Sequence, residues 1–559
     1  MIALATNSAA SASSSEARVR DLLETYSRPD ACAATILCDR HSADSLAYRI
    51  VADDLATQDV AYRELRADSE KFAAALAAIG IGPGDRVATL MGKSREYLVT
   101  LMGIWRLGAV HVPLFTAFAP PAIALRLEGS GARAIVCDQT QRAKLRPGDS
   151  MTSDVPLQII TTGTVSAGDL SFAELVAGQQ VGFPAAAVGG DGPIIHVYTS
   201  GTTGNPKGVI VSLKALASFH TYAEFGQGIT SEDIFWCAAD PGWAYGLYFG
   251  ILSSLLTGVR SILMRGSFSP DGTLALLERE NVSNFAAAPT VYRAMRSTAQ
   301  PASINLPNLR RLSSAGEPLT PEVNVWAQEA FGLQVHDHYG QTEAGMLINN
   351  HHNPAVARPI REGSMGHPMP GWKGVILEAG RDEEAAVGTF GRVAFAVADS
   401  PLLWFHGYDG DPKKTAEKFS ADGRYYLTGD TGTQDAEGYF HFSARDDDVI
   451  IMAGYRIGPF EVESCIASHP MVSETAVIAV PDEVRGEVIE CFIVPSSAAI
   501  PSPELGRDIQ QWVKTRYAAH AYPRAVHFID AMPKTPSGKI QRYVLKQKRL
   551  AQIEAEAKV

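Results

Sequence analysis

One run of small residues constrains this chain most: Thr199-Ser200-Gly201-Thr202-Thr203-Gly204-Asn205-Pro206-Lys207-Gly208. Glycines let backbone N–H groups approach an anion closely, hydroxyls add donors, and Lys207 adds a point charge. Strand-like sequences flank the run at 194–197 and 209–211, so no helix N-terminus is offered to a phosphate. The pattern predicts a mobile loop that folds over the triphosphate of a nucleotide. An ordinary glycine-rich hairpin turn is the alternative.

The composition is that of a folded protein with more than one domain. The chain has 559 residues, a length that exceeds what one hydrophobic core usually holds. Of these residues 46% are hydrophobic, which is enough to form buried cores. A formal net charge of -12 argues against a nucleic-acid partner. The six cysteines are scattered without a Cys-x-x-Cys spacing, which favours reduced thiols in a cytosol over a disulfide framework or a zinc site.

No segment has the pattern of a membrane span, because no apolar run reaches the ~20 residues that a transmembrane helix needs. Residues 1–20 are rich in Ala and Ser but lack the basic start and apolar core of a secretory signal. We expect a disordered tail over 1–20. The alternative is a transit peptide, whose sequence pattern is only weakly present here. The expected location is the cytoplasm.

Alternating strand-like and helix-like segments indicate an α/β fold. A predicted strand over 86–90 is followed by a helix over 94–107, stopped by Gly108, and by a strand over 110–113. The turn at 80–85 is not a dinucleotide fingerprint, because its spacing fails and it precedes a strand. The segment 139–192 reads as loop-rich and irregular.

Several polar turns follow predicted strands, where open α/β sheets bind ligands. A strand over 311–315 ends at Gly316-Glu317-Pro318, and the segment 335–343 ends in Thr342-Glu343. A third turn ends at Asp430, for which a plain β-turn aspartate is the alternative. The aromatic turn at 237–246 suits one wall of a pocket, or ordinary core packing of Trp243 and Tyr245.

Histidines cluster in the same region, at His336, His338, His351 and His352. We interpret them as structural rather than as a transition-metal site, because the region holds no cysteine and no helical pair of histidines four residues apart. The sequence also lacks a Gly-x-Ser-x-Gly elbow, which argues against a serine hydrolase.

Taken in order, these stretches resemble the AMP-forming adenylate synthetases, the superfamily of acyl-CoA synthetases, luciferases and peptide-synthetase adenylation domains. The C-terminal third is most similar to the medium-chain acyl-CoA synthetases. The resemblance implies a large N-terminal domain of βαβ-type subdomains over 21–446 and a small mobile α+β domain over 447–559. Asp447 is the hinge that the resemblance implies between them.

The resemblance also assigns roles around ATP and Mg²⁺. It makes Lys539, Glu343, Thr199 and Lys207 catalytic, with Glu343 on the Mg²⁺. A surface lysine would otherwise be the ordinary interpretation of Lys539 in its loop. The implied ATP and AMP site comprises Thr199, Ser200, Gly201, Thr202, Thr203, Gly204, Lys207, Gly316, Glu317, Pro318, Asp337, His338, Tyr339, Gly340, Gln341, Thr342, Asp430, Arg445, Arg456 and Lys539.

Two further sets follow from the resemblance. The implied acyl pocket comprises Trp243, Ala244, Tyr245, Ala315 and Gly340. Glycine at 340, where acetate-specific relatives carry tryptophan, favours acids larger than acetate, medium-chain or aromatic. The implied coenzyme A positions are Gly454, Tyr455, Arg456, Arg485 and Tyr522.

The implied reaction has two halves. A carboxylate attacks the α-phosphate of Mg-ATP to give an acyl-adenylate and diphosphate, and the thiol of CoA then displaces AMP to give a thioester. The first half needs positioning and charge neutralisation rather than a protein nucleophile. Two alternatives stay open: an enzyme that loads a separate carrier protein, and a nucleotide-binding regulatory protein without turnover. The acid and the oligomeric state are left open.

Overall fold

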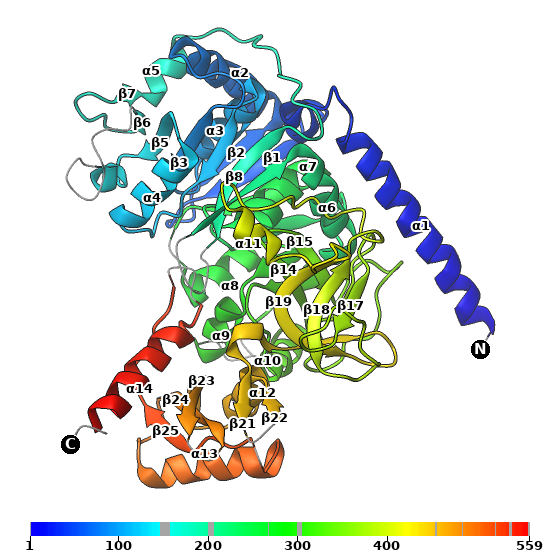
Figure 1. Ribbon diagram of the computed structural model, residues 1–559. Helices are drawn as coiled ribbons and strands as arrows, with labels where there is room; N and C mark the ends of the chain where they lie inside the picture. The colour runs from blue at the N-terminus through cyan, green and yellow to red at the C-terminus, as the bar shows by residue number, and fades with distance from the viewer. Residues whose placement is uncertain are drawn as a thin grey trace.

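A computed structural model describes residues 2–145, 157–199, 206–266, 268–298, 304–452, 455–482, 485–519, 521–535 and 539–556. The fold is mixed α/β, with a large N-terminal part and a small C-terminal domain at one end of it (Figure 1). Among the described residues, no helix is long and apolar enough to cross a membrane.

The first large sheet has seven strands in the order β7-β6-β5-β3-β4-β8-β9, and only the β8–β9 pair is antiparallel. Its strands are β3 (Arg86–Leu90), β4 (Val110–Pro113), β5 (Ala134–Asp138), β6 (Gln158–Thr162), β7 (Leu170–Ser171), β8 (Pro193–Thr199) and β9 (Lys207–Ser212). Its helices are α2 (Tyr62–Ala78), α3 (Arg95–Leu107), α4 (Pro120–Ser130) and α5 (Phe172–Ala177), with a 3₁₀ turn over Arg142–Leu145. Strands β6 and β7 lie in the segment that the sequence analysis expected to be irregular.

Local signals fix the ends of α3 as predicted. The Ser94 hydroxyl caps the first turn by accepting from the Tyr97 N–H, and Gly108 ends the helix with a φ of 79°. A left-handed residue of this kind favours glycine. The helix is buried along most of its length against the first sheet.

The second large sheet has nine strands in the order β16-β15-β14-β13-β12-β10-β11-β1-β2. Its strands are β1 (Leu46–Val51), β2 (Thr57–Ala61), β10 (Ile234–Cys237), β11 (Arg260–Met264), β12 (Asn284–Ala287), β13 (Arg311–Ala315), β14 (Val335–Gln341), β15 (Gly345–Asn349) and β16 (His367–Pro368). Its helices are α6 (Leu216–Thr221), α7 (Ser253–Thr257), α8 (Pro270–Arg279), α9 (Pro289–Thr298) and α10 (Pro321–Phe331), with π-helical turns over Thr35–Asp39, Tyr222–Gly226 and Gly246–Leu252 and a 3₁₀ turn over Leu213–Ala215.

A smaller antiparallel sheet completes the large part. It runs β17 (Gly374–Leu377), β18 (Gly391–Ala396), β19 (Tyr425–Gln434) and β20 (Phe440–Arg445), and α11 (Pro412–Ala416) precedes β19. The register of β19 and β20 places Asp430 opposite Arg445. The sheet therefore brings these two predicted site residues together.

The C-terminal domain has a hydrophobic core of its own, which begins at Ile450 and contains no residue of the large part. Its elements are β21 (Ile450–Met452), β22 (Tyr455–Ile457), α12 (Pro459–Ala467), β23 (Val472–Asp482), β24 (Gly486–Pro495), α13 (Pro503–Arg516), β25 (Ala525–Phe528) and α14 (Arg542–Glu556). A 3₁₀ turn over Asp446–Asp448 connects it to β20. The boundary after residue 446 and the hinge at Asp447 remain predictions, and this turn is where they fall.

The N-terminal segment differs from the expectation of a disordered tail. Helix α1 spans Ile2–Tyr26 and runs along the outside of the large part (Figure 1). Val19, Leu22 and Tyr26 lie on one helical face and are buried, and the Tyr26 hydroxyl lies 2.6 Å from Nδ1 of His220. Arg18 also pairs with Glu224. The structure thus has a helix where the sequence analysis expected a disordered tail over 1–20. Its buried apolar stripe begins at Val19, after the Ala- and Ser-rich start.

Candidate active site

The ends of the predicted phosphate loop lie on two paired strands. Thr199 ends β8, Lys207 begins β9, and the two residues face each other across the antiparallel pair. The loop thus leaves and re-enters the first sheet at one point, as the strand-flanked sequence predicted. Residues 200–205, with the site candidates Ser200, Gly201, Thr202, Thr203 and Gly204, lie outside the described residues.

Tyr408 connects the lysine of this loop to the predicted Mg²⁺ ligand. Its hydroxyl donates a hydrogen bond of 2.6 Å to Oε1 of Glu343, and the ammonium of Lys207 lies 4.9 Å from the centre of its ring. Glu343 is 8% exposed, so this hydroxyl supplies a partner to a buried carboxylate. The sequence analysis missed Tyr408; an aromatic next to Gly407 was the only signal, and it has no specific chemical meaning.

A second cluster surrounds Asp430, which is buried. Its Oδ2 accepts hydrogen bonds from the Tyr339 hydroxyl and, at 2.9 Å, from Nε2 of Gln341. Its Oδ1 lies 3.3 Å from the Arg445 guanidinium. Burial and the neighbouring carboxylate raise the pKa of Tyr339 well above its usual value, so its hydroxyl stays a donor. The structure therefore gathers four of the predicted nucleotide residues.

The turn at Gly316-Glu317-Pro318 adjoins the aromatic turn. Gly316 has a φ of 98°, and a Cβ there would lie 3.0 Å from the ring of Trp243. Glu317 accepts from the Thr290 hydroxyl at 2.9 Å and from Arg293 at 2.6 Å. Backbone conformation and close packing both require glycine at 316. The strand end predicted to face a ligand therefore packs against Trp243.

Lys539 reaches this cluster from the other domain. Its ammonium lies 5.5 Å from the centre of the Trp243 ring. Burial lowers the pKa of Lys539, while the carboxylates of Glu317, Asp430 and Glu343 act in the opposite direction. The Lys539 ammonium thus lies beside Trp243 and within electrostatic reach of three carboxylates of the large part. This is the arrangement that a charged, oxygen-rich ligand between the domains would require.

The predicted acyl-pocket residues lie beside Trp243 and are closely packed. Ala244, Tyr245 and Ala315 are buried. A Cβ at Gly340 would come within 2.3 Å of the Gly345 carbonyl oxygen and 2.8 Å of the Met346 Cα. In this structure the β14–β15 pair would have to shift to admit any side chain at 340, a constraint that the sequence could not show. Its role in setting acyl size stays a prediction.

Strand β14 also carries Asp337 and His338. Burial raises the pKa of Asp337 to about 7. His338 accepts from the Tyr222 hydroxyl through Nδ1, 2.7 Å away, and donates through Nε2 to the Asn350 carbonyl at 3.1 Å. Pro318 and Thr342 lie in the turns that follow β13 and β14.

Three histidine rings meet behind β14, which the spacing in the sequence did not indicate. Each of His336, His338 and His352 has one ring nitrogen that lies within 4.8 Å of a ring nitrogen of the other two. His336 and His352 stack with ring centres 3.5 Å apart and contact the carbonyls of Asn350 and Leu312. His338 has both nitrogens engaged, so it offers no lone pair to a cation. The structural interpretation of these histidines stays a prediction, which their hydrogen bonds support.

The coenzyme A positions are only partly described. Gly454 lies outside the described residues, as do the side chains of Tyr455, Arg456 and Asp447. Arg485 is exposed in the turn before β24. Tyr522 lies beneath two cations, with Lys514 3.9 Å and Arg524 3.8 Å from its ring centre. That Tyr522 contacts CoA stays a prediction.

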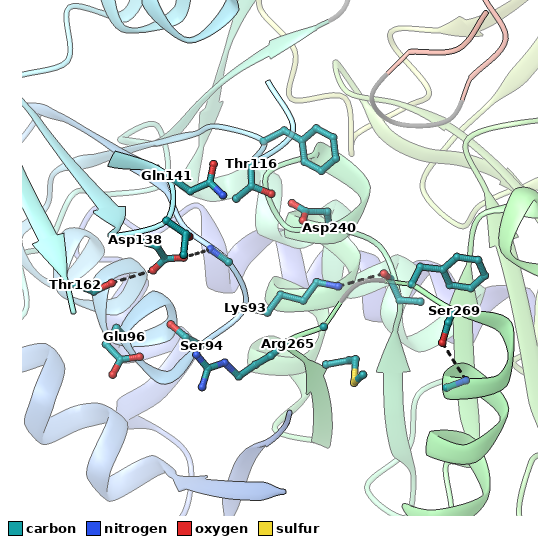
Figure 2. A pocket seen from close by; sticks show the side chains of 18 of the residues that line it. Lys93, Ser94, Glu96, Thr116, Asp138, Gln141, Thr162, Asp240, Arg265 and Ser269 are labelled. Carbon is teal, nitrogen blue, oxygen red and sulfur yellow. Dashed lines mark hydrogen bonds between the residues drawn. The ribbon is translucent and has the colours of Figure 1, made fainter. Parts of the chain in front are cut away.

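A cavity of about 810 Å³ lies between the carboxyl ends of the two large sheets (Figure 2). It is lined by residues at or just after the ends of β3, β5, β10 and β11, including Lys93, Asp138, Asp240 and Arg265. The Lys93 ammonium crosses it to the Ala238 carbonyl, 3.3 Å away (Figure 2). Asp240, in its wall, precedes Trp243 in the aromatic turn. The cavity thus borders the aromatic turn but is not lined by the predicted acyl-pocket residues.

A small domain that brings a lysine to a nucleotide-type cluster on a large α/β domain defines the adenylate-forming class of enzymes. The chain belongs to the family described as AMP-binding enzyme, which matches residues 39–397, and the AMP-binding enzyme C-terminal domain matches residues 461–539.

Similar proteins cover nearly the whole chain. It is 35% identical to acetyl-coenzyme A synthetase of Bacillus subtilis, over 91% of this chain and 89% of that protein. It is 33% identical to the mitochondrial acyl-coenzyme A synthetase ACSM3 of Mus musculus, over 87% and 84%. The crystal structure of the anthranilate CoA ligase AuaEII with anthranoyl-AMP has a TM-score of 0.83 and 27% identity, and the match covers 93% of this chain and 97% of that one.

Proposed function

We propose that this protein is a carboxylate–CoA ligase that forms an acyl-adenylate from ATP and then transfers the acyl group to the thiol of CoA. The observation that carries the proposal is the convergence of Lys539 with Trp243, Glu317, Glu343 and Asp430. Relatives named acyl-coenzyme A synthetases and a similar structure holding an acyl-AMP support the same reaction.

The residues have distinct roles in adenylation. Lys539 stabilises the negative charge that develops as the carboxylate attacks the α-phosphate, and Lys207 holds the departing diphosphate. Glu343 is the carboxylate that fits Mg²⁺, a hard cation that takes oxygen ligands and commonly few of them from protein. The bound ion would neutralise phosphate charge. Asp430 and Arg445 bind the ribose.

Thioester formation requires the small domain to move, because Lys539 occupies the cluster in this structure. Rotation at Asp447 would withdraw the lysine and bring the Gly454–Arg456 segment toward the adenylate. We infer that this arrangement of the two domains serves the first half-reaction. Among acids, we propose medium-chain or aromatic ones, since anthranilate fits a related fold and Trp243 offers a flat wall.

Diphosphate release with a panel of acids tests the proposal. Acetate, hexanoate, octanoate, benzoate and anthranilate should be assayed with ATP and Mg²⁺, with and without CoA. Thioester that forms with free CoA supports the ligase. Adenylate that accumulates and reacts only with a carrier protein supports the alternative acceptor, and ATP binding without diphosphate release contradicts both.

A further inference from the structure

The ammonium group of Lys418 lies beside the Asp430 cluster. No sequence motif around Lys418 predicts a role in the site. Lys418 follows α11, and its ammonium donates to the Thr428 carbonyl at 2.9 Å and to Oε1 of Gln341 at 3.4 Å. It also lies 5.4 Å from the centre of the Tyr426 ring. This lysine therefore contacts the backbone turn that leads to Asp430 and a side chain that binds Asp430.

Gln341 lies between Lys418 and Asp430 and links them through its amide. Its Oε1 accepts from Lys418 and, at 2.9 Å, from the Tyr426 hydroxyl. Its Nε2 donates to the Thr428 carbonyl at 2.8 Å and to Asp430 at 2.9 Å. An ammonium can only donate and a carboxylate only accept, so the amide has a single favourable orientation.

We propose that Lys418 is a positioning residue for adenylation: it fixes Gln341, and through Gln341 it holds the Asp430 carboxylate in the orientation that binds the ribose hydroxyls of ATP. The inference rests on the proposed function, because Asp430 is assigned to the ribose there. Lys418 itself was not among the residues that the resemblance assigned, and its contacts come from the structure alone.

The electrostatic environment agrees with this role. Burial lowers the pKa of Lys418, while the charges of Glu343 and Asp430 raise it again. The lysine thus offsets part of the negative charge of two carboxylates at the place where a polyphosphate must bind. Removal of this charge would weaken ATP binding beyond the loss of one hydrogen bond.

The test compares ATP with 2′,3′-dideoxy-ATP in diphosphate release by the full-length enzyme. Wild type should prefer ATP, because the dideoxy nucleotide lacks both ribose hydroxyls. Lys418→Met should raise KM for ATP about tenfold with a smaller effect on kcat, and should lower the preference for ATP about tenfold, the size expected for a charge-assisted hydrogen bond. Lys418→Arg, which keeps charge and donors, should restore part of the preference.

Lys414→Met is the matched control, because Lys414 lies on the same segment, is 41% exposed and pairs with Glu417. It should change neither KM nor the preference. Gln341→Met breaks the same link from the other side, so it should lower the preference as well, and adding Lys418→Met to it should lower the preference little further.

Each failure has a distinct signature. If wild type releases no diphosphate with any acid, the proposed function fails. If wild type is active and prefers ATP, but Lys418→Met retains the full preference, Lys418 has no positioning role. An additive double variant would also overturn the proposed link through Gln341.

Discussion

The Tyr408 hydroxyl donates a hydrogen bond of 2.6 Å to the Glu343 carboxylate while the Tyr408 ring faces the Lys207 ammonium. One side chain thus contacts both the predicted Mg²⁺ ligand and the predicted phosphate ligand. The segment that carries it is held by the Asp409 N–H, which donates to the Gly208 carbonyl at 2.9 Å. Tyr408 therefore couples the start of β9 to Glu343 through direct contacts.

Tyr408→Phe should lower the rate of adenylation about tenfold and raise the Mg²⁺ concentration at half-maximal rate. The ring under Lys207 remains, but Glu343 loses the hydrogen bond that orients it. Diphosphate release measured across a Mg²⁺ titration checks this. Tyr425→Phe is the control, because Tyr425 donates to Glu384 at 3.1 Å outside the site. Equal Mg²⁺ dependence in both variants would contradict the coupling.

Lys539→Ala should slow adenylate formation by ~100-fold or more, since it removes a charge that acts on the transition state. Thioester formation from supplied acyl-adenylate should survive, because in the proposed mechanism the lysine leaves the cluster for that step. Single-turnover measurements of the two half-reactions check this. Lys534→Ala is the control in the same loop region, where Lys534 pairs with Glu474 at 2.7 Å. Equal losses in both half-reactions would reject the assignment to Lys539.

The sequence predicted those parts of the fold whose signals are local. Helix α3 has its serine cap and its terminal glycine, and the strands around the phosphate loop have apolar runs. The α1 helix was missed because its stabilising contacts are distant: Tyr26 meets His220, and Arg18 meets Glu224. Such contacts leave no periodic signal strong enough to outweigh an Ala- and Ser-rich start.

The candidate site also contains residues that the sequence could predict and residues that it could not. Asp430, Tyr339 and Lys539 belong to recognisable stretches, and the structure places them in one cluster. Tyr408 and Lys418 act through single contacts from segments without a motif, so only the tertiary structure shows them. Gly340 was assigned to the acyl pocket, but the structure adds a packing requirement that arises from the register of β14 and β15.

Acid should destabilise the protein through its buried histidines. Burial lowers the pKa of His336 to about 4, below the value of about 6.5 for the unfolded chain. Between pH 6.5 and 4 the imidazole of His336 binds a proton in the unfolded chain but stays neutral in the folded state. The free energy of unfolding therefore falls as pH falls. Each such group adds a slope of about 1.4 kcal/mol per pH unit.

His336→Asn can keep a donor to the Asn350 carbonyl but cannot titrate in this range. The free energy of unfolding, from urea titrations at pH 4 to 8, should therefore fall less steeply below pH 6.5 than in wild type. Above pH 7 the two curves should run parallel, which serves as the internal control. Identical slopes between pH 4 and 6.5 would show that His336 does not contribute.

The size of the acid that the enzyme accepts depends on the residues that line the predicted acyl pocket. The resemblance suggested that Gly340→Trp would close the pocket to long acids and spare acetate. The structure changes this expectation, because even a Cβ at 340 would come within 2.3 Å of the Gly345 carbonyl oxygen. Gly340→Ala should already cost about 1–3 kcal/mol of stability, and Gly340→Trp should lower activity with every acid, acetate included.

Trp243 offers the cleaner test, because its ring closes the strand end beside Gly316 and Lys539. Trp243→Leu should open space there and shift kcat/KM toward larger acids, by up to about 0.8 kcal/mol for each further methylene buried. A series from acetate to octanoate, with benzoate, measures the shift, and thermal unfolding confirms that the variant is folded. Wild type should prefer acids larger than acetate. A preference for acetate in wild type, or an unchanged profile in a folded Trp243→Leu variant, would place the acyl group elsewhere.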